Sequence, residues 1–205
     1  MTRDVVLAPG LWIPGAAMTL LAARLGRAGY APQVLAYRSR SLFDGNVARC
    51  ARFVRETLDG RPAHFVGHSL GGVLILEMLN AHPDVPVASA VLLGSPARGS
   101  LAGRRFGAAQ LGRWMMGGCG ELWPEREAVW KRKAPLGIVA GTLPVALGRI
   151  LGRLPGPNDG VVQVEETAVE GMTARTLVPL GHSQLIVSAA VGRLVERFIS
   201  TGRFE

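Results

Sequence analysis

The chain has 205 residues, of which 48% are hydrophobic and 19% are charged, and this composition fits one globular domain with a sizeable core. Its formal net charge of +8 makes nucleic-acid binding a class to consider. The basic residues are scattered, however, with the longest run at 131–133 and no zinc-finger or RNA-binding signature beside it. We therefore expect no nucleic-acid partner, and we interpret the charge as a solvated surface with at most weak attraction to anionic membranes or acidic partners.

The two cysteines, Cys50 and Cys119, indicate neither a disulfide framework nor a metal site. The first residues lack the apolar stretch of a signal peptide. No run approaches the roughly 18 apolar residues of a membrane-spanning helix. These features predict a cytoplasmic protein that needs no metal or other cofactor, and they leave the oligomeric state open.

Short apolar runs alternate with helical stretches, which is typical of a mostly parallel sheet covered by helices on both faces. The predicted strands are 5–8, 33–37, 64–67, 88–93, 136–140 and 175–178. The predicted helices are 18–28, 46–58 with Asp44 as its N-cap, 70–81 and 185–199. We expect a single α/β domain over residues 1–205, with a reduced sheet of about six strands.

Residues 97–134 interrupt this alternation and contain three of the four tryptophans. Insertions at this edge of a parallel sheet overhang the carboxyl ends of the strands, where ligands bind. We interpret the segment as a cap with an apolar underside that supplies Trp114 and Met115 to a substrate pocket. Two forms are open, a mobile lid and a peripheral helix pair that packs on the core.

The sequence Gly67-His68-Ser69-Leu70-Gly71-Gly72 stands between an apolar strand and an apolar helix. A Gly-x-Ser-x-Gly turn in this context holds a serine exposed at the strand end, where a base and oxyanion donors can reach it. Ser69 is therefore the candidate nucleophile, and the N–H of Leu70 is one candidate oxyanion donor. An ordinary glycine-rich turn of a doubly wound sheet is the alternative.

The second oxyanion donor is expected in the loop after the first strand. Gly10 lets the backbone of that loop approach closely, which makes the N–H of Leu11 the candidate donor and Trp12 a wall of the pocket. The alternative is an N-terminal loop that simply buries its tryptophan.

Four histidines could serve as the base. His64 begins the strand that leads to the serine, His68 adjoins the serine but points away from it, and His82 lies beyond the following helix. His182 follows the last strand, so it lies at the carboxyl edge of the sheet and is the candidate base for Ser69.

Asp159 is the candidate acid because it follows the strand 136–140 and precedes His182, as the order serine, acid, histidine requires. It lies in a strong turn signal, Pro157-Asn158-Asp159-Gly160. An Asx turn without catalytic meaning is the alternative. Other acids in this part of the chain are Glu165, Glu166 and Glu170.

Taken in order, these segments resemble those of the α/β-hydrolase superfamily, and more narrowly those of small bacterial lipase- and esterase-like serine hydrolases. The resemblance runs from residue 4 to about residue 205 and is carried by Pro9-Gly10-Leu11-Trp12, the serine turn, Asn158-Asp159-Gly160-Val161-Val162 and Gly181-His182-Ser183. It implies the α/β-hydrolase fold and serine-hydrolase chemistry. Pro9 departs from the pattern, since many relatives have histidine there.

These observations predict a carboxylic-ester hydrolase that works through a Ser-His-Asp triad and an acyl-enzyme, on apolar acyl substrates. A thioesterase, acyltransferase or amidase with the same triad is the alternative, and an acyl–coenzyme A substrate would suit Arg98, Arg104 and Arg105. A non-catalytic interaction protein on this fold is the third hypothesis.

Overall fold

A parallel β-sheet forms the centre of the molecule. The computed structural model describes residues 2–13, 15–38, 40–144 and 153–205. Within these ranges every pair of neighbouring strands is parallel, and the spatial order is β2-β1-β3-β4-β5-β6. The strands are β1 Asp4–Ala8, β2 Ala31–Val34, β3 Ala63–His68, β4 Val87–Leu93, β5 Leu136–Gly141 and β6 Ala174–Val178. The predicted parallel sheet of about six strands is confirmed.

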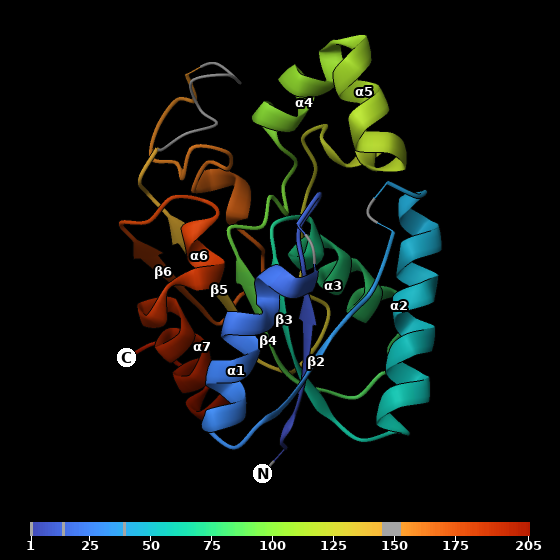
Figure 1. Cartoon of the computed structure of the whole chain (residues 1–205), viewed down its shortest axis with the longest axis vertical. Helices are drawn as coiled ribbons and strands as arrows, with labels where there is room; N and C mark the ends of the chain where they lie inside the picture. The colour runs from blue at the N-terminus through green and yellow to red at the C-terminus, as the bar shows by residue number, and fades with distance from the viewer. Residues whose placement is uncertain (1, 14, 39, 145–152) are drawn as a thin grey trace.

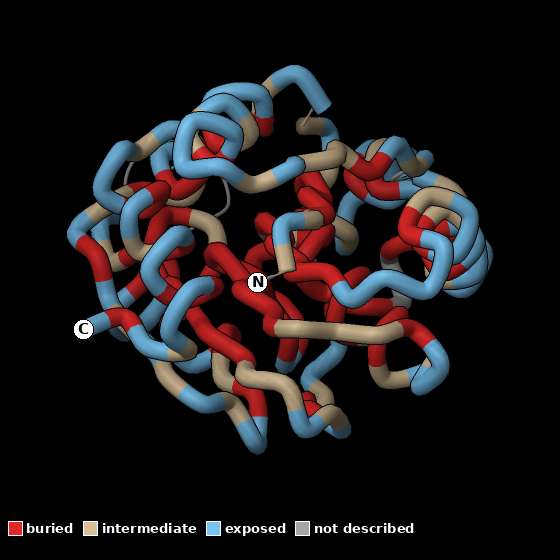
Figure 2. Tube along the Cα trace, turned by 90° about the horizontal axis from the view of Figure 1, so that it is seen from below, coloured by how far each residue is buried: buried red, intermediate tan, exposed pale blue. Residues whose placement is uncertain are grey.

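Helices cover both faces of the sheet (Figure 1). One face carries α1 Thr19–Arg27, α6 Gln184–Val187 and α7 Ala189–Thr201, and the other carries α2 Phe43–Leu58 and α3 Leu70–Ala81. Successive residues of a strand point to opposite faces, so Val5 and Leu7 pack with the first group of helices while Val6 and Ala8 pack with the second. Figure 2 shows the buried strands enclosed by the exposed outer faces of the helices.

Three elements differ from the predicted ones by more than one residue. Strand β2 ends at Val34 because it pairs only with β1, whose own ladder ends at Ala8. Helix α2 begins at Phe43, so Asp44 lies in its first turn and is not the N-cap. The predicted last helix is two helices, since Ser188 adopts a ψ of 130° and its hydroxyl accepts the Val191 N–H to cap α7.

The segment between β4 and β5 forms α4 Leu101–Ala108, α5 Gln110–Met116 and the 3-10 helix η2 Gly117–Leu122. These residues, 101–122, are called the cap below, and they lie beyond the carboxyl ends of the strands (Figure 1). At the start of the cap the Glu166 carboxylate accepts the Leu101 N–H at 2.5 Å. Near its end the Arg40 guanidinium donates to the Trp114 carbonyl at 2.8 Å, and the Arg40 carbonyl accepts the Gly118 N–H at 2.9 Å. Both ends of the cap are thus anchored to the body of the domain.

The turn between β3 and α3 packs directly on the backbone that follows β1. A side chain at Gly67 would run into the backbone of Gly72, and one at Gly71 would run into the carbonyl oxygens of Ala8 and Pro9. Backbone atoms cannot swing aside as a side-chain end can, so these positions exclude even a methyl group.

Gly71→Ala is expected to lower the free energy of unfolding by at least about 2 kcal/mol, because the new methyl displaces packed backbone. Gly26→Ala is the matched control, since Gly26 lies on the exposed side of helix α1 and a methyl there would have no heavy atom within 4 Å. That change should stabilise the protein by roughly 0.5–1 kcal/mol through helix propensity. Urea unfolding of both variants measures the two effects, and equal stabilities would contradict the backbone clash.

Candidate active site

Ser69 occupies the junction of β3 and α3 in a strained backbone conformation. Its φ is 53° and its ψ is −125°, a combination that costs a non-glycine residue roughly 1–3 kcal/mol and persists only where the surroundings enforce it. The Ser69 N–H donates to the Leu93 carbonyl at 2.9 Å, which ties the turn to the end of β4. Leu70 begins α3, so its N–H lies in the first turn and has no partner within the helix.

Asp159 and His182 form a hydrogen-bonded pair. His182 Nδ1 lies 2.7 Å from Asp159 Oδ2, and the His182 N–H donates to the Asp159 carbonyl at 3.0 Å. The other carboxylate oxygen accepts the N–H groups of Val161 and Val162 at 3.0 and 2.7 Å. The Asp159 side chain is 1% exposed, so the carboxylate is held by three donors in a nearly dry site, which orients the imidazole.

Gly94 makes room for this pair at the end of β4. Its φ is 54°, and a side chain there would approach Asp159 Oδ2 at 3.0 Å and His182 Nδ1 at 3.2 Å. Only a residue without a side chain allows β4 to end so close to the acid and the base.

His68 packs against the candidate base from the strand side. The two rings lie 4.7 Å apart, and His68 Nε2 is 3.1 Å from the His182 carbonyl oxygen. Nε2 therefore carries the proton and donates, which leaves Nδ1 as a buried acceptor that has no partner among the described residues. Burial lowers the pKa of His68 to about 3, helped by the nearby His182, so the ring is neutral at ordinary pH.

Residues 9–13, here called loop 9–13, lie beside the serine and are held from two sides. The Tyr37 hydroxyl donates to the Pro9 carbonyl at 2.6 Å. The Trp12 indole N–H donates to the Met115 carbonyl at 3.0 Å, and its ring meets Phe106 edge-on at 5.5 Å. Trp12 itself has a φ of 57°. The loop is therefore bonded both to the segment after β2 and to the cap.

Ser69 and His182 line one cavity of about 230 Å³ between loop 9–13 and the cap. Its other walls are mostly apolar: Leu11, Trp12, Ile13, Pro96, Ala102, Phe106, Met116, Trp123, Val161 and Val162. Ser69 Oγ makes no hydrogen bond to another described residue. Such bonds are often long in free enzymes and tighten when substrate binds.

The predicted site residues fall into two groups. Ser69, His182, Leu11 and Trp12 line the cavity. Asp159 lies behind His182, to which it is hydrogen-bonded, and Leu70 follows Ser69 as the first residue of α3. The cap differs from the prediction. Trp114 is 66% exposed, and neither Trp114 nor Met115 is among the residues that line the cavity. Sequence reasoning missed the inward side chains of the cap and its end, Phe106, Met116 and Trp123.

The other titratable candidates have different tasks. Glu166 accepts the N–H groups of Leu101 and Gln163, so it anchors the cap. Buried His64 pairs with Ser89 Oγ at 2.7 Å on the body of the sheet, and burial lowers its pKa. His82 lies 3.2 Å from Arg55 at the far end of α3. None of the three lines the cavity in the described part of the chain.

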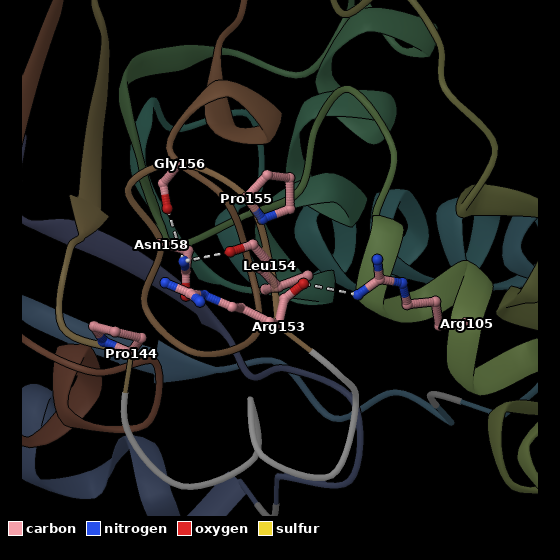
Figure 3. Close-up of a pocket in the computed structure, with 7 residues that line it drawn as sticks. All are labelled: Arg105, Pro144, Arg153, Leu154, Pro155, Gly156 and Asn158. Carbon is pink, nitrogen blue, oxygen red and sulfur yellow. Dashed lines mark hydrogen bonds between the residues drawn. The ribbon is translucent and has the colours of Figure 1, made fainter.

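A larger depression of about 1000 Å³ lies beside the acid loop (Figure 3). Arg105 donates to the Arg153 carbonyl at 3.1 Å across it, and the Asn158 amide donates to the Gly156 carbonyl at 2.9 Å. No predicted catalytic residue is among its described lining residues. The depression is lined by Pro144 and Arg153, and residues 145–152 between them are outside the described ranges. We therefore assign the candidate site to the smaller cavity.

The model of the alpha/beta hydrolase family matches residues 5–184. The chain belongs to this family. The match spans the strained serine turn, the Asp159 loop and His182, and with the six-stranded parallel sheet it confirms the predicted α/β-hydrolase fold. No curated protein matches the chain.

Solved structures of hydrolases share the fold at low sequence identity. A metagenomic carboxyl esterase matches with a TM-score of 0.69 and 19% identity over 98% of this chain and 76% of that one. A pyrethroid hydrolase from Sphingobium faniae gives 0.63 and 15% over 98% of both chains. An extracellular alpha/beta-hydrolase from a Paenibacillus species gives 0.62 and 15% over 98% and 99%.

Neither a metal cluster nor a membrane span is evident in the described ranges. They contain no group of three or more His, Cys, Asp or Glu side chains placed to hold a metal ion. Their helices are all too short or too polar to cross a bilayer.

The low pKa of His68 predicts how stability depends on pH. Below the ordinary pKa of 6.5 the unfolded chain binds a proton that the folded chain refuses until about pH 3, so stability falls as the pH falls between these values. One such proton contributes a slope of about 1.4 kcal/mol per pH unit. His68→Gln should unfold with a shallower acid dependence than the wild type in urea titrations between pH 7 and 4, and an unchanged slope would contradict the buried neutral ring.

Proposed function

We propose that the protein is a serine hydrolase that cleaves carboxylic esters, with Ser69 as nucleophile, His182 as base and Asp159 as the acid that orients it. The observation that carries the proposal is the dry Asp159–His182 pair at 2.7 Å, whose histidine lines the same cavity as a serine in a strained turn. Strain at a non-glycine residue is typical of functional sites.

The chemistry follows from these positions. His182 takes the Ser69 proton while Oγ attacks the acyl carbon, and the carbonyl electrons move onto oxygen. The tetrahedral intermediate collapses, the bond to the leaving oxygen breaks, and His182 returns the proton to the alcohol. Water then attacks the acyl-enzyme with His182 as base again, which releases the acid and regenerates Ser69.

The backbone N–H groups of Leu11 and Leu70 are the proposed oxyanion donors. Leu70 supports this role because it begins α3, where the N–H has no helical partner and the helix dipole is positive. Leu11 supports it because it lines the cavity from loop 9–13. Gly10 lets that loop approach, since a side chain there would lie 3.0 Å from Ser69 Cβ.

The cavity favours an apolar acyl group. Ten of its fifteen lining residues carry apolar side chains outside the catalytic pair, and only about 230 Å³ is available beside the serine. Structural neighbours named a carboxyl esterase and a pyrethroid hydrolase support ester bonds as the target.

Nothing in the cavity favours an acyl–coenzyme A thioester. Arg98 and Arg104 line a neighbouring hollow, but Glu125, Glu165 and Glu166 line it as well, so it does not favour a phosphate group. Arg105 is engaged with the Arg153 carbonyl. An amide or thioester of the same acyl chain is therefore the comparison substrate, with the ester expected to turn over faster.

Ser69→Ala is expected to abolish turnover and labelling while the melting temperature stays nearly unchanged. The reason is that Oγ is the nucleophile and makes no hydrogen bond to another described residue. Intact mass after treatment with a fluorophosphonate should show one adduct on the wild type and none on the variant, and ester turnover should fall at least roughly a thousandfold. An adduct or retained turnover on Ser69→Ala would remove Ser69 from the mechanism.

Trp12→Phe is expected to lower kcat for an ester by roughly tenfold with a smaller change in KM, because loop 9–13 loses its bond to the cap while keeping an aromatic ring against Phe106. Trp114→Phe is the matched control, since that tryptophan lies outside the cavity. Steady-state kinetics on both variants decide the matter, and equal kcat values would show that the Trp12 bond does not position the loop.

A further inference from the structure

The outer surface of the cap exposes large apolar side chains. Leu111 and Trp114 are each 66% exposed and lie three residues apart on α5, so they share one helix face. Leu42 is 69% exposed, and its backbone lies against Gly118 at the end of the same cap. A group of exposed apolar side chains often marks an interaction site.

Arginines surround this apolar group. The Arg40 guanidinium lies 4.7 Å above the Trp114 ring and donates to the Trp114 carbonyl. Arg104 and Arg113 line one groove of about 390 Å³ on the cap, and Arg104 also borders the separate hollow that contains Glu125, Glu165 and Glu166. The cap contains three arginines and one acidic residue, Glu121. Leu42, Leu111 and Trp114, together with Arg40, Arg104 and Arg113, are called the cap face below.

The cap face is placed at one end of the molecule. Helices α4 and α5 stand beyond the carboxyl ends of the strands, opposite the N-terminus (Figure 1). The inner side of the same helices lines the Ser69 cavity through Phe106 and Met116. A surface bound to the cap face would therefore lie next to the cavity.

We propose that the cap face binds the surface of an anionic phospholipid membrane. Tryptophan prefers the boundary between headgroups and acyl chains, leucines insert into the acyl region, and arginines pair with lipid phosphates. The inference goes beyond the hydrolase chemistry, since it needs no catalytic residue.

Two other occupants fit the cap face less well. A second copy of the chain across a two-fold axis would bring Arg40, Arg104 and Arg113 of one copy close to those of the other. A nucleic acid would pair with the arginines but would leave Leu42 and Leu111 without an apolar partner, because its affinity comes from phosphates. A membrane offers acyl chains to the leucines and phosphates to the arginines.

Flotation of the purified full chain with vesicles tests the proposal. The wild type should float with vesicles of phosphatidylcholine mixed with phosphatidylglycerol, much less with phosphatidylcholine alone, and less as salt rises. Tryptophan fluorescence should shift to the blue on binding, because Trp114 leaves water.

Two variants separate the apolar and the charged contributions. L111S/W114S should lower the partition coefficient on anionic vesicles at least roughly tenfold by removing the inserted side chains. R104Q should lower it roughly fivefold by removing one charge. The controls are L177S on β6 and R193Q on α7. Both side chains are exposed, and both elements lie away from the cap (Figure 1). Both controls should bind like the wild type, and thermal melts should show all variants folded.

The proposal is overturned if the wild type stays unbound with anionic vesicles, or if L111S/W114S and R104Q both float as the wild type does. Light scattering measures whether the protein is a monomer or a dimer. A dimer that L111S/W114S abolishes, with no vesicle binding by the wild type, would assign the cap face to contact between two copies.

Discussion

The backbone of the β3–α3 turn lies against the backbone that follows β1, and the geometry of the site depends on this contact. Gly71 abuts the carbonyl groups of Ala8 and Pro9, and Gly10 abuts Ser69. Because no space is left between the start of α3 and the carbonyl groups at the end of β1, a shift of Ser69 would press on loop 9–13. This close packing of backbone, together with the bond from the Ser69 N–H to the Leu93 carbonyl, holds Ser69 beside loop 9–13.

A chain of polar contacts connects Ser69 to His182 and Asp159. Ser69 is tied to the end of β4, His68 holds the carbonyl of His182, and His182 pairs with Asp159. The neutral state of His68 suits the proposed mechanism, because a positive ring 4.7 Å from His182 would oppose a positive charge on His182. Burial therefore keeps the His68 ring uncharged beside His182.

The sequence is sufficient to predict the sheet and the residues at its carboxyl edge, because the chain order of the strands limits what can meet there. It is insufficient for the cap, where glycines at 103, 107 and 112 leave no clear periodicity to show which face turns inward. The prediction that Trp114 lines the pocket is wrong, since that side chain is outside while Met116 is inside. The break at Ser188 escapes prediction for another reason, since a single cap residue divides an otherwise continuous apolar pattern.

Trp12 joins the candidate site to the cap through one half-exposed indole, which is 47% exposed. Its hydrogen bond to Met115 and its edge-on contact with Phe106 together contribute about 2 kcal/mol. An interaction of about 2 kcal/mol changes the ratio of bound to released loop by roughly thirtyfold. Coupling free energies between distinct sites in proteins have a similar size. The proposed binding at the cap face could outweigh this free energy, since burial of a few apolar side chains contributes as much. Loop 9–13 therefore meets the cap through Trp12 and also through Leu11, which packs against the apolar cluster that contains Met116 and Leu122.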